Sequence, residues 1–162
     1  MTDPDDPRVG DLAESAILRV ILDSIGTAEG SDIGPGDDAA VLRAPDGRIV
    51  ATTDTLVHGP DFRLAWSSGA DLGWKAAAVN LADVAAMGAR PTGLLVALAM
   101  PADTRLSFVR DLAAGLAACC DALAPGCAVI GGDLTISSTL TIAVTALGSL
   151  EGRAPVLRSG AC

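Results

Sequence analysis

The sequence predicts an α+β fold in which a mixed, mostly antiparallel sheet packs against helices. Apolar residues recur at helical spacing in three segments. These predicted helices span 11–25, 71–87 and 104–123. For the second one, Asp71 is a plausible N-cap and Gly88 suits the left-handed position after the last turn.

Short apolar segments between the helices have the composition of strands. They span 39–42, 48–53, 92–100, 127–130 and 139–147. The last alternates cleanly, with Leu140, Ile142 and Val144 on one face and threonines on the other. The first two are expected to pair through a turn at Pro45-Asp46-Gly47. Strands in hairpin-like pairs favour a mixed sheet over a doubly wound one.

Composition narrows the class of protein. The 162 residues suffice for one domain with a core of Ala, Val, Leu and Ile, because the chain has only two Phe, two Trp and no Tyr. The two tryptophans, Trp66 and Trp74, are expected to pack. A net charge of −9 argues against a nucleic-acid surface. A single histidine and the absence of a C-x-x-C pair argue against zinc.

The chain carries no apolar segment long enough to span a membrane, and its N-terminus is too acidic for a signal peptide. We therefore expect a cytoplasmic protein. Residues 1–9, rich in Pro and Asp, are predicted to be disordered. Residues 10–150 form the domain. Residues 151–162 follow the last strand and a turn without a closing element, which suggests one part of a longer protein.

Five short acidic motifs are the most informative feature of the chain. They are Gly36-Asp-Asp-Ala-Ala40, Thr52-Thr-Asp-Thr55, Asp61, Asn80-Leu-Ala-Asp83 and Gly131-Gly-Asp133. Isolated Asp residues beside Gly and Thr suggest carboxylates that folding gathers around hard cations. Magnesium prefers oxygen ligands and usually bridges carboxylates to a bound phosphate. Because the chain has no P-loop, the motifs indicate nucleotide chemistry of another kind.

Asp83 is the sharpest single candidate. Its spacing from Leu72, Ala76 and Val79 places it on the same stripe of the predicted helix. A carboxylate among core-facing residues is costly unless it is paired or binds a metal. The metal-ligand interpretation is favoured; the alternative is an Asp at the edge of the stripe, solvated or bonded to Asn80.

The other acidic positions are less specific one by one. Tandem Asp residues after Gly36 are common in turns, and Asp54 at a strand end could cap the following turn. Asp133 is predicted to end a third strand, where Gly131 and Gly132 would let a phosphate approach backbone N–H groups. Their combination favours a shared site.

In this order, the motifs resemble the N-terminal domain of the thiamine-monophosphate kinase family, within the superfamily of aminoimidazole ribonucleotide synthetase-like, ATP-using proteins. The resemblance extends from about Gly10 to the end of the chain. It rests on Gly36–Ala40, Thr53-Asp-Thr-Leu-Val57, the block Asp71–Pro91, Ile130-Gly-Gly-Asp-Leu-Thr135 and Arg158-Ser-Gly-Ala161. The block 71–91 is the most specific of these.

This resemblance implies the fold of that superfamily and transfer of the ATP γ-phosphoryl group onto thiamine monophosphate, giving thiamine diphosphate. It implies several Mg²⁺ ions, no catalytic side chain of its own, and a homodimer that joins sheets across a two-fold axis through strands such as 92–100 and 139–147. The metal-ligand positions it implies are Asp38, Thr52, Thr53, Asp54, Asp83 and Asp133. The ATP-binding positions it implies are Gly132, Asp133 and Arg158.

Two departures from the family pattern concern the substrate. The family has a substrate-contacting histidine where this chain has Asp61, and His58 lies three residues earlier. Asp61 and His58 are therefore the substrate-binding candidates, with altered contact expected. The family also has a C-terminal domain that completes the active site, to which 151–162 would connect. The chain by itself is expected to be inactive.

Two kinds of alternative are open. Related ATP-using enzymes share such acidic loops, but selenophosphate synthetase should show a Cys or selenocysteine with a Lys before Gly36. The hydrogenase-maturation protein tends to join Asn and Asp directly, whereas Leu81-Ala82 separates them here. A non-catalytic dimerising domain is the other alternative; such a relic should lose the carboxylates that this chain keeps.

Overall fold

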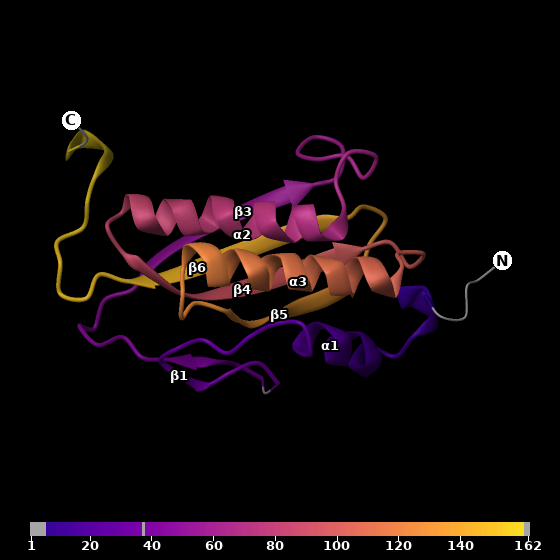
Figure 1. The fold of residues 1–162 in the computed structure, drawn as a ribbon, viewed down its shortest axis with the longest axis horizontal. Helices are drawn as coiled ribbons and strands as arrows, with labels where there is room; N and C mark the ends of the chain where they lie inside the picture. Colours follow the sequence, from indigo (N-terminus) through magenta and orange to yellow (C-terminus); the bar gives the residue numbers. More distant parts are fainter. Residues whose placement is uncertain (1–5, 37, 161–162) are drawn as a thin grey trace.

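The computed structural model describes residues 6–36 and 38–160. Figure 1 shows α2 and α3 side by side on one face of the sheet, with α1 and β1 beside β5. The helices and strands, in chain order, are η1 (Val9–Asp11), α1 (Glu14–Leu22), β1 (Ser31–Ile33), β2 (Val41–Leu42), β3 (Val50–Val57), α2 (Gly69–Ala86), β4 (Arg90–Met100), α3 (Leu106–Leu123), β5 (Val129–Ile136), β6 (Thr141–Ser149) and η2 (Arg158–Gly160).

The main sheet has the strand order β3-β6-β4-β5. β6 pairs antiparallel with both β3 and β4. β4 and β5 are parallel, because α3 carries the chain back to the starting end of the sheet before β5 begins. The predicted α+β class with a mixed, mostly antiparallel sheet is confirmed.

The sheet has one fully covered face. Ile142, Val144 and Ala146 of β6 are buried and face the helices. The intervening residues, including Ala143 and Thr145, lie on the opposite face and are half-buried. This is the alternation that the sequence of the last strand predicts.

Glycines bring α2 and α3 into backbone contact. A Cβ atom at Gly73 would lie 2.0 Å from the carbonyl oxygen of Leu112, and one at Gly115 would lie 2.2 Å from that of Ala70. Larger side chains would force the helices apart. The close approach explains how a chain so poor in aromatic residues forms a dense core from small side chains.

The N-terminus of α2 is a capping box. The hydroxyl of Ser68 accepts from the Asp71 backbone N–H (3.2 Å), and the Asp71 carboxylate accepts from the Ser68 N–H (2.9 Å). Hydrogen bonds from Ser68 lower the pKa of Asp71. The N-cap predicted at Asp71 is therefore wrong by three residues. Gly88, with φ of 74°, occupies the predicted left-handed position after the helix.

Strand pairing differs from the prediction near the N-terminus. Segments 39–42 and 48–53 do not form a hairpin with each other. β2 instead pairs with β1, inside the predicted loop 26–36, and β3 pairs with β6 over its whole length. The long β3–β6 register outcompetes a short local hairpin, since it also buries Leu56 against the helices.

Part of the N-terminal segment lies against α3. The carboxylate of Asp6 accepts from the Ser107 backbone N–H (2.9 Å) and hydroxyl (2.7 Å), and Val9 is buried. The backbone hydrogen bond from Ser107 lowers the pKa of Asp6. These contacts depart from the disorder predicted for residues 6–9; residues 1–5 lie outside the described part of the chain.

The tryptophans also differ from expectation. Trp66 is 79% exposed and Trp74 is 41% exposed, so neither packs in the core. Arg63 lies over the Trp66 ring instead, 5.3 Å from its centroid. In the described parts of the chain, 6–36 and 38–160, none of the helices combines the length and apolar character needed to cross a membrane.

Candidate functional site

The first group of candidate residues lies at the β3 edge of the sheet. The hydroxyl of Thr52 on β3 donates to the carboxylate of Asp83 on α2 over 3.3 Å. Asp54 follows two residues later and is on the same face of the strand, half-buried. We call Thr52, Asp54 and Asp83 the β3 group. Asp54 sits within β3 rather than at its end, so the turn-capping interpretation of this residue is wrong.

Asp83 is exposed rather than buried among core residues. The buried stripe of α2 instead includes Asn80 and Val84. It lies on the same side of the helix as Gly73, which packs closely on α3. The edge position weighed from sequence is the one observed, but Thr52 is the hydrogen-bond partner, not Asn80. Burial therefore does not argue for a metal here; the exposed carboxylate is accessible to one.

Thr53 does not join this group through its side chain. Its hydroxyl donates to the Val144 carbonyl (3.0 Å) and accepts from the Thr145 hydroxyl (3.1 Å). Its side chain therefore faces the side of the sheet away from α2. Sequence reasoning treated the consecutive threonines alike, although neighbouring strand residues point to opposite faces.

The second group lies at the β5 edge. Gly132 and Asp133 are within β5, which continues to Ile136 instead of ending near Ile130. Both are exposed and, together with Asp38, they line a groove of about 1050 Å³ between α1 and the sheet. We call Asp38, Gly132 and Asp133 the β5 group. Asp37 lies outside the described residues.

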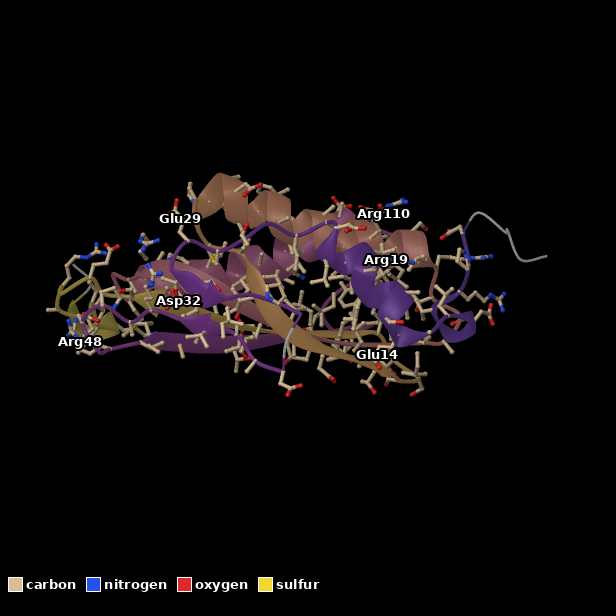
Figure 2. All side chains as sticks on the ribbon, turned by 90° about the horizontal axis from the view of Figure 1, so that it is seen from below. Glu14, Arg19, Glu29, Asp32, Arg48 and Arg110 are labelled. Carbon is tan, nitrogen blue, oxygen red and sulfur yellow. The ribbon has the colours of Figure 1, made fainter. Side chains whose placement is uncertain are left out.

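Gly132 has a steric requirement of its own. A Cβ atom at this position would lie 1.9 Å from the carbonyl oxygen of Val96 on β4. Figure 2 shows this side of the molecule, with Glu14 and Arg19 on α1 and Asp32 on β1 in front of the sheet. Gly132 is also exposed, so its backbone can be reached from solvent with no side chain of its own in the way.

The two groups lie at opposite edges of the same sheet. In the strand register, Asp54 on β3 aligns with Val144, then Val96, and finally Gly132 on β5. Three strand spacings amount to about 14 Å. Over residues 6–36 and 38–160, no three or more Asp, Glu, His or Cys side chains are gathered as a metal site. The single predicted cluster is thus divided in two.

The substrate-binding candidates lie in the loop between β3 and α2. The Asp61 carboxylate accepts from the Val57 backbone N–H (2.8 Å), and the Asp61 carbonyl accepts from Lys75 Nζ (2.7 Å). The exposed His58 ring packs against Phe62, 5.5 Å between centroids. Asp61 thus holds the turn. Sequence reasoning missed that Lys75 fixes this loop, since no periodicity links two positions fourteen apart.

Arg158 is an exposed residue of η2. The segment before it passes the C-terminal end of α2, where the Val156 N–H donates to the Met87 carbonyl over 3.0 Å. Asp83 lies one helical turn before Met87 on the same helix. Arg158 is therefore at the same end of α2 as Asp83.

The donor atoms of both groups suit magnesium. They are carboxylate and hydroxyl oxygens, with no sulfur and no imidazole among them. Magnesium is commonly bound through one or two protein carboxylates, with waters and phosphate oxygens completing an octahedron. Each group supplies at least the one or two carboxylates required, so the residues fit magnesium although the protein offers few ligands.

The fold and the two acidic edges define a class of domain. Residues 36–150 match the family model described as AIR synthase related protein, N-terminal domain. The chain belongs to this family. Among named relatives, the thiamine-monophosphate kinase of Corynebacterium glutamicum is 44% identical over 158 residues, which cover 96% of this chain and 46% of the relative.

Solved structures lead to the same group. A thiamine-monophosphate kinase from Stenotrophomonas maltophilia superimposes with a TM-score of 0.66 at 37% identity, covering 85% of this chain and 42% of that one. AaThiL complexed with AMPPCP and TMP gives a TM-score of 0.60 at 29% identity, covering 87% and 43%.

A further solved structure shares the fold at lower identity. Escherichia coli HypE superimposes with a TM-score of 0.67 over 89% of this chain and 44% of its own, but at 20% identity this shows a common fold alone. The chain spans about half the length of the thiamine-monophosphate kinases it matches.

Proposed function

We propose that the protein containing this chain transfers the γ-phosphoryl group of ATP to thiamine monophosphate, giving thiamine diphosphate. The observation that carries the proposal is that oxygen-donor side chains line both sheet edges of a domain whose relatives are named for this reaction. A relative's structure with AMPPCP and TMP supports the pair of substrates.

The role proposed for the chain is positioning and charge neutralisation. Phosphoryl transfer needs little covalent help from the protein, so no side chain is assigned as a catalytic acid, base or nucleophile. Several Mg²⁺ ions are proposed, held by Asp38, Asp54, Asp83 and Asp133, with oxygens of Thr52 and Thr53. When bound, they would neutralise phosphate charge between these carboxylates and ATP.

Residues of this chain would orient those ligands. Thr52 donates to Asp83 and so fixes the direction of one carboxylate oxygen. Gly132 is exposed and has no side chain, which suits close approach of a phosphate to the backbone. Arg158 is proposed as a phosphate contact. Asp61 and His58 are proposed to lie near the thiamine moiety, with Asp61 acting through the turn that it holds.

A homodimer is also proposed. The strands suggested for its contact, 92–100 and 139–147, correspond to β4 and β6 and are interior to the sheet. They can meet a second copy only through the open face, where Leu95 is 38% exposed. Covering this face would bury apolar surface. We also propose a cytoplasmic location, and that 151–162 begin a connection to a C-terminal domain that completes the site.

The test uses the complete gene product with Mg-ATP and thiamine monophosphate, and follows thiamine diphosphate by chromatography. Product is expected from the native protein and from Asp32→Asn, a control in a surface ion pair with Arg43. Asp83→Asn should form far less. A folded native protein that binds Mg-ATP without forming product would overturn the substrate and favour a sister enzyme. Failure to bind Mg-ATP would favour a non-catalytic dimerising domain.

A further inference from the structure

The turn after β6 contains an unusual backbone conformation. Glu151 has φ of 51°, and no other non-glycine residue in the described chain has a positive φ. A side chain in the left-handed region is strained and persists where its surroundings hold it. The next residue, Gly152, is also left-handed, with φ of 84°. Something other than local preference must stabilise this turn at Glu151.

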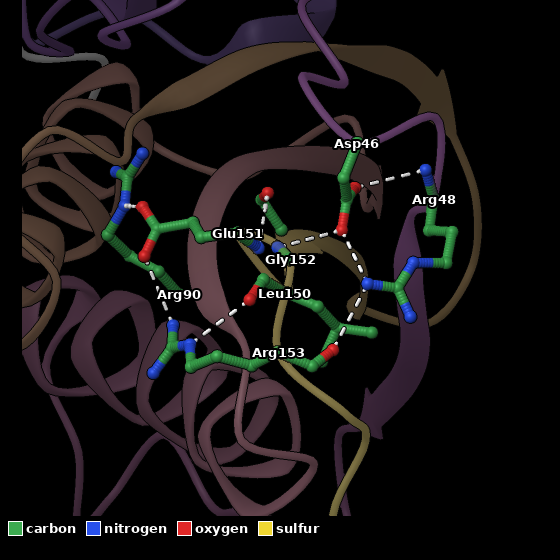
Figure 3. Close-up of polar contacts among 8 residues, drawn as sticks. Asp46, Arg48, Arg90, Leu150, Glu151, Gly152 and Arg153 are labelled. Atoms are coloured by element: carbon green, nitrogen blue, oxygen red, sulfur yellow. Dashed lines mark hydrogen bonds and ion pairs between the residues drawn. The ribbon is translucent and has the colours of Figure 1, made fainter.

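Two arginines hold the Glu151 carboxylate. Arg90 Nε donates to one oxygen over 2.7 Å, and Arg153 Nη2 donates to the other over 3.1 Å. Arg90 is the first residue of β4, after the short connection 87–89 that follows α2. Figure 3 shows Glu151 between the two guanidinium groups. The carboxylate therefore ties the exit turn of β6 to the end of the α2–β4 connection.

A second carboxylate completes the arrangement. Asp46 accepts from the Gly152 backbone N–H (3.0 Å) and from Arg48 Nη2 (2.8 Å), and Arg48 also donates to the Arg153 carbonyl (3.1 Å). Figure 3 shows these contacts on the other side of the turn. Side chains from two distant parts of the chain, Arg90 and the pair Asp46 and Arg48, thus contact the consecutive residues 151–153.

The turn decides where the following segment runs. Three residues beyond Arg153, the Val156 N–H donates to the Met87 carbonyl, and Val156 Cγ2 lies close to Gly88. Arg158 follows in η2. The chain thereby passes the end of α2 that carries Asp83.

We propose that Glu151 is a positioning residue that places Arg158 beside the end of α2 that carries Asp83. This inference rests on the proposed function insofar as Arg158 contacts phosphate. The ion pairs are exposed, with side chains 42% and 44% accessible for Arg90 and Glu151, so they contribute little to global stability. Their effect is local, because they fix the direction in which the chain leaves β6.

The test uses the complete protein with Glu151→Gly, which accepts a positive φ but lacks the carboxylate, and Glu151→Gln, which keeps the side-chain length. Amide hydrogen exchange at Arg153 and Val156 is expected to accelerate by about tenfold in Glu151→Gly and less in Glu151→Gln, at an unchanged melting temperature. Asp32→Asn, which breaks another exposed ion pair, should leave these amides unchanged. Unchanged exchange in Glu151→Gly overturns the inference.

A double-mutant cycle then tests whether Glu151 acts through Arg158. The measured quantity is the affinity of the complete protein for Mg-AMPPCP. Glu151→Gly and Arg158→Gln should each weaken binding of the nucleotide by about tenfold. The double variant should bind it no more weakly than Arg158→Gln alone. Additive losses, or no loss in Arg158→Gln, overturn the inference. A native protein that binds the nucleotide without phosphorylating thiamine monophosphate refutes the proposed substrate and leaves this cycle readable.

Discussion

The two edges of the main sheet present their acidic residues in different ways. At the β3 edge, Thr52 braces Asp83 through a hydrogen bond between strand and helix. At the β5 edge, Asp133 and Asp38 line an open groove beside the bare backbone of Gly132. Magnesium–oxygen distances are about 2.1 Å, so one ion cannot be shared across about 14 Å of sheet. Ions bound at the two edges would therefore be separate ions.

The largest expected effect tests whether both edges serve one reaction. In the complete protein, Asp83→Asn and Asp133→Asn should each lower kcat/KM for thiamine diphosphate formation by about 100-fold or more, because each removes a carboxylate proposed to hold the Mg²⁺ that neutralises phosphate charge. If the edges act together, the double variant should lose much less than the product of the two losses. A fully multiplicative loss, or full activity in either single variant, contradicts a shared role. Asp32→Asn serves as the control.

The next effect concerns the β5 edge by itself. Gly132→Ala places a Cβ against the Val96 carbonyl and should lower the free energy of unfolding by roughly 1–3 kcal/mol. Gly131→Ala is the matched control, since its Cβ meets only the movable end of the Leu95 side chain, at 3.2 Å. Urea unfolding of this chain measures both. Equal stability of the two variants would show that β5 does not approach β4 this closely.

A smaller effect is expected at the N-terminus of α2. Ser68→Ala removes the cap of α2, the helix that carries Asp83, and should cost about 1 kcal/mol of unfolding free energy. Ser67→Ala, one residue before the cap, should cost less. Urea unfolding distinguishes them. A Ser68→Ala protein as stable as the native chain would show that tertiary packing alone fixes the start of α2.

The smallest expected effect is the pH dependence of the stability that Asp71 contributes in the same capping box. The pKa of Asp71 is held below its ordinary value of 3.8 by the hydrogen bonds from Ser68. The folded chain therefore binds this proton less readily than the unfolded chain. The stabilisation is complete above about pH 4 and is lost as pH falls through the lower folded value. The melting temperature should fall less steeply between pH 5 and pH 3 in Asp71→Asn than in the native chain. An identical fall would show that Asp71 does not contribute to the loss of stability in acid.

Local patterns predict much of this fold. Three amphipathic segments became α1, α2 and α3, and the alternation in 139–147 became β6. Pairing between strands was less predictable, since it depends on partners far apart in sequence. β1 is only three residues long, polar in part, and gave no strand signal. Gly131 and Gly132 resembled a turn but lie inside β5, where close packing on β4 requires a glycine.

The sequence nominates candidate site residues but does not predict how they are arranged in space. The resemblance selected oxygen donors that do lie on the surface, but it could not show that β3 and β5 are opposite edges. Helical spacing suggested a buried Asp83 because apolar and small residues were weighed alike. In the structure, Gly69 and Gly73 move the buried stripe toward α3, which leaves Asp83 exposed.

The pairing of β3 with β6 also has a consequence for synthesis of the chain. Val50 aligns with Gly148, so β3 has no partner in the main sheet until the ribosome has made nearly a hundred further residues. β6 is likewise the strand that joins β3 to β4. The helices and the parallel β4–β5 pair are complete before the sheet can close. A nascent chain stopped before residue 141 would expose the hydrogen-bonding groups of both strands, where aggregation begins.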